Sequence, residues 1–393
     1  MTTDGRRRRL IWAIDALVVL GLGGAAAAGA TVLSGGELPI AAAATTTTIS
    51  PSPTVPGTGG RPQLVTAPAT KPTTMPAPVF RAPLTGVRVD EATSQMLAGR
   101  RSIAVKIDDA PAVDTHPGLD QADIVYEVSV EGGLTRYLAL FQSQVPERVG
   151  PVRSVRTTDF SLVANLGVPV LAFSGGNSRT VADALRLPVI AFPPDLADRG
   201  VYWRDKTVDA PHNLFLSPLQ VWGHVLGGAG AVAPFANVRT DSPSTSTAVA
   251  AVPAAGVRLQ FSNVTDSSFV WDEAKSAWVR FQRGRAQLDG SGRPLGVDNV
   301  VVLFTQYGVS PYDRNSPEAV SIGGGQGLLL SGGASQPVVW TRPDGASPFT
   351  LSTPEGGVID LPVGRTWTAL VGGGPERATP IDPASAAIML ASR

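Results

Sequence analysis

Two strand-like segments on either side of Gly132-Gly133 constrain the fold of this 393-residue chain most strongly. Residues 122–131 alternate apolar and polar side chains, and residues 134–142 continue with a second strand pattern. Two adjacent glycines can both take positive φ, as a two-residue hairpin turn requires. We therefore predict an antiparallel hairpin that places Ser129 opposite Arg136.

The predicted hairpin has one charged face and one apolar face. With that turn, Glu127, Ser129, Glu131 and Arg136 share the charged face, while Tyr137 lies on the apolar one. The two glutamates are then about 13 Å apart along the strand, further than the roughly 5–9.5 Å between glycosidase carboxylates. A solvated or ion-paired surface, a ligand-lining surface and a catalytic surface remain as alternatives, and the spacing disfavours the last.

Strand and helix patterns alternate after the hairpin. Residues 157–166 and 179–185 are expected to be helices, and residues 168–174 to be a buried strand between them. The order strand, helix, strand, helix predicts an α/β N-terminal domain with a mixed sheet over residues 86–235.

The remaining sequence predicts a second, β-rich domain. Residues 236–255 are rich in Ser, Thr, Ala, Val and Pro, which indicates an inter-domain linker. Short aromatic strands between Gly, Asp and Pro turns then predict a compact β-rich C-terminal domain over residues 256–374. No structure is assigned to the tail, residues 375–393.

The N-terminal sequence is typical of an exported protein. A basic cytoplasmic segment, residues 1–9, precedes an apolar stretch at 10–33, which reaches the roughly 20 residues needed to cross a bilayer. This stretch is either a retained, single-pass membrane anchor or a cleaved secretory signal. Residues 34–85, rich in Thr, Pro, Ala and Ser, predict a disordered linker. The globular part is therefore expected outside the cytoplasm, and secreted if the stretch is cleaved.

The amino-acid composition excludes or disfavours several classes of function. Lys+Arg 32 balance Asp+Glu 32, so the net charge gives no indication of nucleic-acid binding. The chain has no cysteine, which excludes disulfides, thiol catalysis, Cys-ligated zinc and a lipid-modified cysteine. With 3 histidines there is no His-rich metal site, and we expect neither a metal nor another cofactor.

The segment Gly150-Pro-Val-Arg-Ser-Val-Arg-Thr-Thr-Asp indicates anion binding most strongly. Arg153 and Arg156 precede a predicted helix start, and guanidinium groups suit carboxylate or phosphate. Equally, both arginines could pair internally with the hairpin glutamates or with Asp159 and organise the domain.

Histidines supply the remaining candidates. A His116–aspartate metal site, or a Ser174 nucleophile assisted by His212, can be proposed from residue types alone. However, a loop histidine beside a proline is more often a structural hydrogen-bonding residue. The predicted ligand-binding residues are Glu127, Glu131, Arg136, Arg153, Arg156, His212 and Asn213.

Several long motifs occur in the order of a known family. They are Val105-Lys-Ile-Asp, His116-Pro-Gly-Leu-Asp-Gln-Ala-Asp, Glu131-Gly-Gly-Leu-Thr-Arg-Tyr, Gly150-Pro-Val-Arg-Ser-Val-Arg, Ala210-Pro-His-Asn-Leu, Asp298-Asn-Val-Val-Val and Gly364-Arg-Thr-Trp. On these motifs the chain resembles the YerB-like family, whose members are named as bacterial lipoproteins. The resemblance covers about residues 86–372. It implies an α/β domain followed by a β-rich domain in an envelope protein.

The resemblance does not imply a reaction, because the family is a domain of unknown function with no catalytic residues to transfer. One departure matters: lipoproteins carry an acylated cysteine, and this chain has none. Its attachment must therefore depend on residues 10–33.

These observations favour a membrane-anchored, non-enzymatic protein that binds a cell-wall polymer or an envelope protein through a polar Glu/Arg pocket. The alternative is a wall-polymer hydrolase or transferase that uses Glu127 or Glu131 with His212 as acid and base. That alternative requires His212 or another carboxylate within about 3–9 Å of a glutamate in an open cleft. A purely structural spacer is a third possibility.

Overall fold

Short runs of β-branched and aromatic residues form many of the strands in the computed structural model, as their fit to a pleated, buried surface predicts. The structure describes residues 78–197, 200–225, 227–236 and 251–392. The predicted cytoplasmic segment, membrane span and most of the N-terminal linker lie outside these residues. Within them, no helix is both long and apolar enough to cross a membrane.

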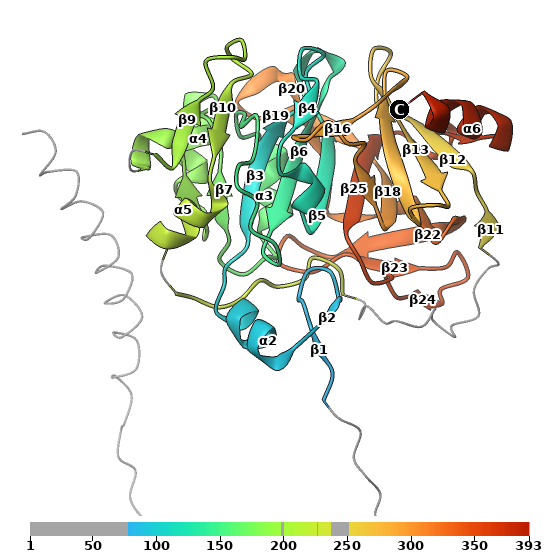
Figure 1. Cartoon of the computed structure of the whole chain (residues 1–393), viewed down its shortest axis with the longest axis horizontal. Helices are drawn as coiled ribbons and strands as arrows, with labels where there is room; N and C mark the ends of the chain where they lie inside the picture. The colour runs from blue at the N-terminus through green and yellow to red at the C-terminus, as the bar shows by residue number, and fades with distance from the viewer. Residues whose placement is uncertain (1–77, 198–199, 226, 237–250, 393) are drawn as a thin grey trace, which may run out of the picture. The chain divides into compact units, whose positions relative to one another are not determined.

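One large mixed sheet extends across both predicted domains (Figure 1). Its strands are, in spatial order, β24 (Val358–Ile359), β23 (Thr350–Ser352), β22 (Ala334–Arg342), β21 (Gly323–Ser331), β18 (Asn299–Thr305), β25 (Thr366–Gly372), β5 (Ile124–Ser129), β6 (Thr135–Phe141), β3 (Ile103–Asp108), β7 (Val170–Ala172) and β8 (Ile190–Phe192). A short strand, β11 (Val252–Pro253), pairs with β22 and lies within the predicted inter-domain linker. The two predicted domains therefore share a sheet, with β25 between β18 and β5 and parallel to both.

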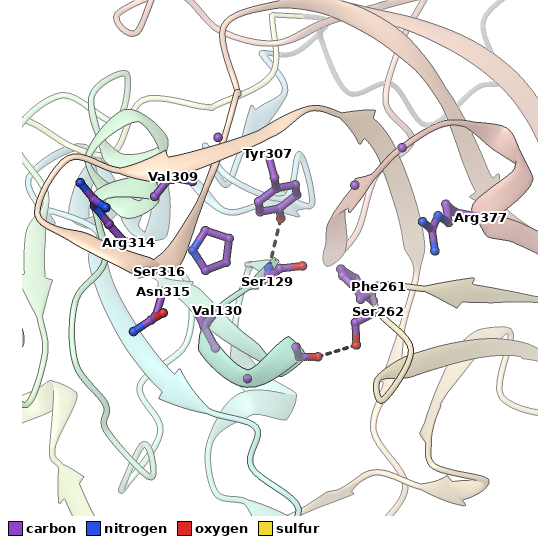
Figure 2. A pocket seen from close by; sticks show the side chains of 16 residues that line it. Ser129, Val130, Phe261, Ser262, Tyr307, Val309, Arg314, Asn315, Ser316 and Arg377 are labelled. Atoms are coloured by element: carbon purple, nitrogen blue, oxygen red, sulfur yellow. Dashed lines mark hydrogen bonds between the residues drawn. The ribbon is translucent and has the colours of Figure 1, made fainter.

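Several strands of this sheet end at the same edge. β5, β25 and β18 are parallel neighbours, and β3, β7 and β8 run in the same direction. Ligands of open α/β sheets bind outside the carboxyl ends of such strands. A pocket lies at this edge, just beyond β5, β18 and β25 (Figure 2).

Five α-helices occur among the described residues, and two of them were predicted from the sequence. They are α2 (Glu91–Ala98), α3 (Thr157–Val163), α4 (Ser178–Ala184), α5 (Pro218–His224) and α6 (Pro383–Ala391). The predicted helices at 157–166 and 179–185 are thus confirmed as α3 and α4. The Asn177 side chain accepts from the backbone N–H of Arg179 and caps α4. In Figure 1, α4 and α5 lie at one end of the molecule and α6 at the other.

A second sheet confirms the β-rich character of the C-terminal region. It contains β15 (Arg285–Ala286), β14 (Ala277–Gln282), β13 (Asp266–Asp272), β12 (Gly256–Gln260), β26 (Ala378–Ile381) and β17 (Gly296–Val297). The tail after residue 374, to which the sequence assigns no structure, forms β26 and α6. Its apolar residues explain this order, because Ala386 and Met389 pack against the buried side chains of Val270 and Phe281.

Four strand pairs complete the fold. They are β1 (Phe80–Arg81) with β2 (Arg88–Val89), β4 (Thr115–His116) with β16 (Leu288–Asp289), β9 (Tyr202–Arg204) with β10 (Leu214–Leu216), and β19 (Tyr307–Ser310) with β20 (Asp313–Ala319). β1 falls inside the predicted N-terminal linker, and Leu84 is buried in the core. Ordered structure therefore begins before residue 86, because this short segment can bury apolar side chains.

The hairpin exists, but its predicted register was wrong by one residue. Ser129 pairs with Thr135, and the intervening loop contains a 3₁₀ turn, Glu131–Gly133. Both glycines do have positive φ, 72° each. The backbone N–H of Val130 closes the longer loop by donating to the carbonyl of Leu134 at 2.8 Å.

The register decides which side chains share a face. Glu127 pairs with Tyr137, whereas Arg136 pairs with Val128 and with Asp108. A slip of one residue exchanges the faces of a strand, so Glu127 and Arg136 lie on opposite faces of the sheet. The predicted charged face containing both residues does not form.

Candidate functional site

The site at the carboxyl edge is built from the end of β3 and the segment that follows β6. The backbone N–H of Arg153 donates to the carbonyl of Lys106 at 2.8 Å, and Val152 forms a bridge with Ile107. These contacts hold the Gly150–Arg156 segment alongside β3. They bring its two arginines to the edge where β3 ends at Asp108.

Asp108 is the central carboxylate of this edge. Its Oδ2 accepts a hydrogen bond from His212 Nδ1 at 2.6 Å and lies 3.1 Å from Arg153 Nε. The Asp108 side chain is almost fully buried, whereas His212 and Arg153 are partly exposed. Asp108 therefore orients an imidazole and a guanidinium that ligands can reach.

Glu131 and Arg156 form a bidentate ion pair. Arg156 Nε and Nη2 lie 2.6 and 2.8 Å from the two carboxylate oxygens of Glu131. Burial alone would raise the pKa of Glu131, but hydrogen bonds from Arg156 and Ser316, with the charge of Arg156, outweigh it and lower the pKa to about 2. One of the two predicted arginines is thus held mainly by an internal partner.

Arg136 has a different environment. Its side chain is partly buried, and its one side-chain hydrogen bond is a long one, 3.5 Å to the carbonyl of Ser154. Among the described residues no carboxylate lies within 4 Å of its guanidinium. Burial and the charges of Arg156 and Arg153 lower the pKa of Arg136 to about 10, although Asp108 and Glu131 oppose this effect.

We call Arg136, Arg153 and Arg156 the arginine cluster. Lys106 lies near it, fully buried and paired with Asp159 at 2.6 Å, and burial lowers the pKa of Lys106. Among the described residues, Asp108, Glu131 and Asp159 pair with Arg153, Arg156 and Lys106, and Arg136 has no such ion pair. A cation without an internal ion pair is what an anion-binding site requires.

A small cavity lies beside the cluster. It has a volume of about 100 Å³, enough for about three waters at roughly 30 Å³ each. Its lining residues include Glu131, Ser154, Arg156, Asn177, Asp313 and Ser316.

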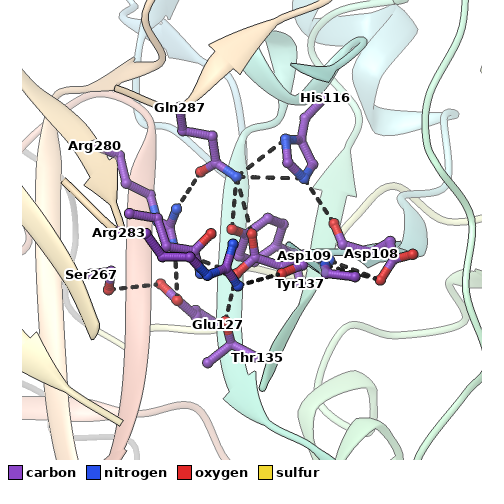
Figure 3. Close-up of polar contacts among 12 residues, drawn as sticks. Asp108, Asp109, His116, Glu127, Thr135, Tyr137, Ser267, Arg280, Arg283 and Gln287 are labelled. Carbon is purple, nitrogen blue, oxygen red and sulfur yellow. Dashed lines mark hydrogen bonds and ion pairs between the residues drawn. The ribbon is translucent and has the colours of Figure 1, made fainter. Parts of the chain in front are cut away.

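Glu127 belongs to a separate, buried network on the other face of the sheet (Figure 3). Its carboxylate accepts from Arg280 Nη2 at 2.7 Å and from Trp367 Nε1 at 2.9 Å, and neither Glu127 nor Arg280 is accessible to solvent. The Arg280 guanidinium also lies over the rings of Trp367 and Tyr137. Burial raises the pKa of Glu127, and the charge of Arg280 opposes that rise.

Asp109, His116 and Gln287 extend this network. Asp109 accepts from Thr135 Oγ1 at 2.6 Å, and Gln287 Nε2 lies 3.1 Å from His116 Nδ1. Because His116 Nε2 donates to the carbonyl of Asp108 at 2.8 Å, Nδ1 is the acceptor for Gln287. Burial lowers the pKa of His116, consistent with this neutral form. The network links strands of the N-terminal region with β14 and β25 of the C-terminal region.

The structure places the predicted ligand-binding residues in separate parts of the fold. The edge brings together Arg136, Arg153, Arg156, Glu131 and His212, but Glu127 lies within the core. Asn213 interacts elsewhere, because its Oδ1 accepts from Arg204 Nη1 at 2.7 Å.

The acid–base alternative lacks the arrangement that it requires. Both glutamates are ion-paired with arginines, and His212 bonds to Asp108 instead. Among the described residues there is also no group of three or more His, Cys, Asp or Glu side chains placed to hold a metal ion.

Sequence reasoning missed Asp108, Arg280 and Trp367. Asp108 could have been found, because it ends a short run of mainly apolar residues, now seen as β3, at the edge where ligands bind. Arg280 lies in the aromatic run Trp278-Val-Arg-Phe, where a charged residue within an apolar strand indicates a buried ion pair.

The fold and the site define an α/β protein whose mixed sheet continues into a strand-rich C-terminal region, with ion-paired arginines at its carboxyl edge. Residues 84–228 match the family described as "Protein of unknown function (DUF3048) N-terminal domain", and residues 257–368 match the corresponding "C-terminal domain". The chain belongs to this YerB-like family, which confirms the resemblance seen in its motifs.

Two comparisons describe its relatives. The chain is 28% identical over 300 residues to "Putative lipoprotein YerB" of Bacillus subtilis (strain 168), covering 74% of this chain and 86% of that protein. The crystal structure of the YerB protein from Bacillus subtilis matches with a TM-score of 0.66 at 23% identity, over 77% of this chain and 100% of that one. The latter likeness concerns the fold.

Proposed function

We propose that this chain is a membrane-anchored, extracytoplasmic binding protein whose arginine cluster takes the phosphate or carboxylate group of a cell-envelope ligand. The location is supported by the basic and apolar N-terminal sequence at residues 1–33 and by the lipoprotein name of its relative. Because the chain has no cysteine, we assign the anchoring to residues 10–33 rather than to a lipid.

The main support for the proposal is that the charge of Arg136 is not balanced by a neighbouring carboxylate. A desolvated guanidinium is stable only when a partner compensates its charge, and the partner carboxylates nearby are engaged with other cations. An external anion beside Arg136 would supply that compensation. It would also reduce the repulsion among Arg136, Arg153 and Arg156 that lowers the pKa of Arg136.

The ion pairs that Arg153 and Arg156 form within the protein are compatible with ligand binding, because they hold the two guanidinium groups in position. Asp108 fixes Arg153, and Glu131 fixes Arg156, so both guanidinium groups are held in place before a ligand arrives. Such preorganisation reduces the side-chain entropy that binding would otherwise cost. His212, oriented by Asp108, would contribute a further donor next to the anion.

The test is the thermal stability of the full-length protein in inorganic phosphate and in acetate, compared with chloride at equal ionic strength. We expect stabilisation by at least one of the two anions, because a ligand that binds only the native state raises the melting temperature. Replacement of Arg136 by Gln should weaken anion binding about tenfold or more, since charge-assisted hydrogen bonds are lost.

The matched control is Arg285→Gln, which removes one positive charge from an exposed arginine that lines neither cavity described at this edge. This variant should bind the anions as the wild type does. Equal loss in both variants, or no stabilisation by either anion, would contradict the proposal. Mass spectrometry of the cell-associated protein tests the anchor, because a cleaved signal would remove the apolar stretch.

A further inference from the structure

A second, larger pocket lies at the carboxyl ends of β5, β18 and β25 (Figure 2). Its volume is about 530 Å³, within the roughly 300–1,000 Å³ typical of small-molecule sites. Its walls come from the β5–β6 loop, the β12–β13 turn, the β19–β20 hairpin and the segment after β25. The pocket therefore combines segments from both matched regions of the chain.

Hydrogen bonds hold the walls in place. The hydroxyl of Tyr307 accepts from the backbone N–H of Ser129 at 3.1 Å and donates to the carbonyl of Leu370 at 2.8 Å. On another side, Ser262 Oγ donates to the carbonyl of Gly133 at 2.7 Å. The protein's own hydrogen bonds therefore fix the position of the pocket walls.

The pocket has a positive charge that the protein does not neutralise. Arg314 and Arg377 line it on opposite sides in Figure 2, and none of the lining residues is acidic. Among the described residues, no carboxylate lies within 4 Å of either guanidinium. The neighbouring Glu376 is exposed and accepts from the backbone N–H of Gly374 at 2.8 Å. Both arginines are thus available to an anionic ligand.

The uncharged lining suits a hydroxylated molecule with apolar faces. Ser129 and Asn315 offer a hydroxyl and an amide group, while Phe261 and Tyr307 offer ring surfaces. Glycines also line the pocket and leave the backbone accessible. For example, a Cβ added at Gly132 would meet nothing within 4 Å.

We propose that this pocket binds an acidic saccharide, a sugar ring or short sugar chain that carries carboxylate or phosphate groups. Rings would pack on Phe261 and Tyr307, hydroxyls would bond to Ser129, Asn315 and exposed backbone, and the acidic groups would pair with Arg314 and Arg377. The proposal does not depend on the function proposed above, because no residue of the arginine cluster lines this pocket.

The test is isothermal titration of the full-length protein with matched acidic and neutral saccharides. Comparison of oligogalacturonate with its methyl-esterified form tests the contribution of the carboxylate group to affinity. Comparison of a phosphorylated oligomannoside with its dephosphorylated form tests the contribution of the phosphate group. We expect at least one acidic form to bind about tenfold or more tightly than its neutral counterpart. Arg377→Gln and Arg314→Gln should each remove most of this preference.

The matched control is Arg285→Gln, which removes a surface charge elsewhere and should bind the saccharide like the wild type. Both pocket arginines lie at the surface, and unchanged melting temperatures would verify that their variants fold.

Three results would overturn the inference: equal binding of acidic and neutral forms, no binding of any form, or tighter binding of a peptide carboxylate than of any saccharide. Loss of binding in Arg136→Gln but not in Arg377→Gln would also overturn it, and would assign the saccharide to the arginine cluster.

Discussion

The arginine cluster and the Glu127 network lie on opposite faces of the same strands, β3, β5 and β6, and differ in how their charges are balanced. In the network, Arg280 has a carboxylate at 2.7 Å and two aromatic rings. In the cluster, Arg136 has one carbonyl at 3.5 Å. A buried arginine whose charge is balanced by internal partners therefore stabilises the fold, whereas one whose charge is not balanced can bind a ligand.

The largest loss of stability is expected for Glu127→Gln, which disrupts the Glu127 network. The variant keeps the side-chain volume but removes the carboxylate closest to the buried Arg280, whose second carboxylate, Asp109, lies 3.7 Å away. Breaking a buried ion pair in this way typically costs about 3–5 kcal/mol. Urea denaturation at neutral pH measures the change in the free energy of unfolding. The control is Ser267→Ala, because Ser267 Oγ lies 3.5 Å from Glu127 and should contribute less than about 1 kcal/mol. Similar losses in both variants would show that the network is not a structural ion pair.

The pH dependence of stability tests the ion pair between Glu131 and Arg156 at the edge of the sheet. Glu131 has a pKa of about 2 in the folded protein, below its usual 4.5, so its ionised form stabilises the fold. This contribution is complete above about pH 4.5 and is lost as the pH falls towards 2. We expect it to be about 2–3 kcal/mol, since the side chain is only 26% exposed.

Denaturation curves between pH 2 and 5 measure this effect as the difference between the wild type and Glu131→Gln. The difference should shrink as the pH falls. Arg156→Gln removes the partner of Glu131 and should show the same trend. A difference that does not change with pH would contradict the ion pair.

The smallest predicted effect concerns Arg136→Gln. Loss of this cation relieves repulsion by Arg153 and Arg156, so the free energy of unfolding should stay within about 1 kcal/mol of the wild type, or rise. Arg280→Gln is the matched change in the network and should lose several times more. If both variants lose equally, Arg136 is a structural residue and the proposed binding role fails.

Local patterns predicted many elements of the fold. Alternation indicated β5 and β6, and a change of period indicated α3 and α4, because these signals depend on neighbours in the sequence. The hairpin register was not predictable in this way. Gly133 contacts Ser262, 129 residues away in the sequence, and this contact helps to hold a longer loop than the two glycines suggest.

Prediction of the site was limited by the same long-range contacts. Arg153, Arg156 and Glu131 were found from their chemistry, and they do meet. The partners of Glu127 could not be found, because they come from β13 and β14, which pack on the face of β5 that carries this residue, and from β25, which pairs with β5 within the sheet. Residue types indicate charge, but only the register shows whether that charge is buried.

The position of β25 has a consequence for how the chain matures. This strand, close to the C-terminus in sequence, fills the centre of the sheet between β5 and β18. The sheet cannot close until Thr366–Gly372 is synthesised, and such distant pairing makes folding slow. A chain truncated before this strand would expose two open edges prone to aggregation. If the chain is exported as we propose, late closure would keep the sheet incomplete until nearly all of the chain has crossed the membrane.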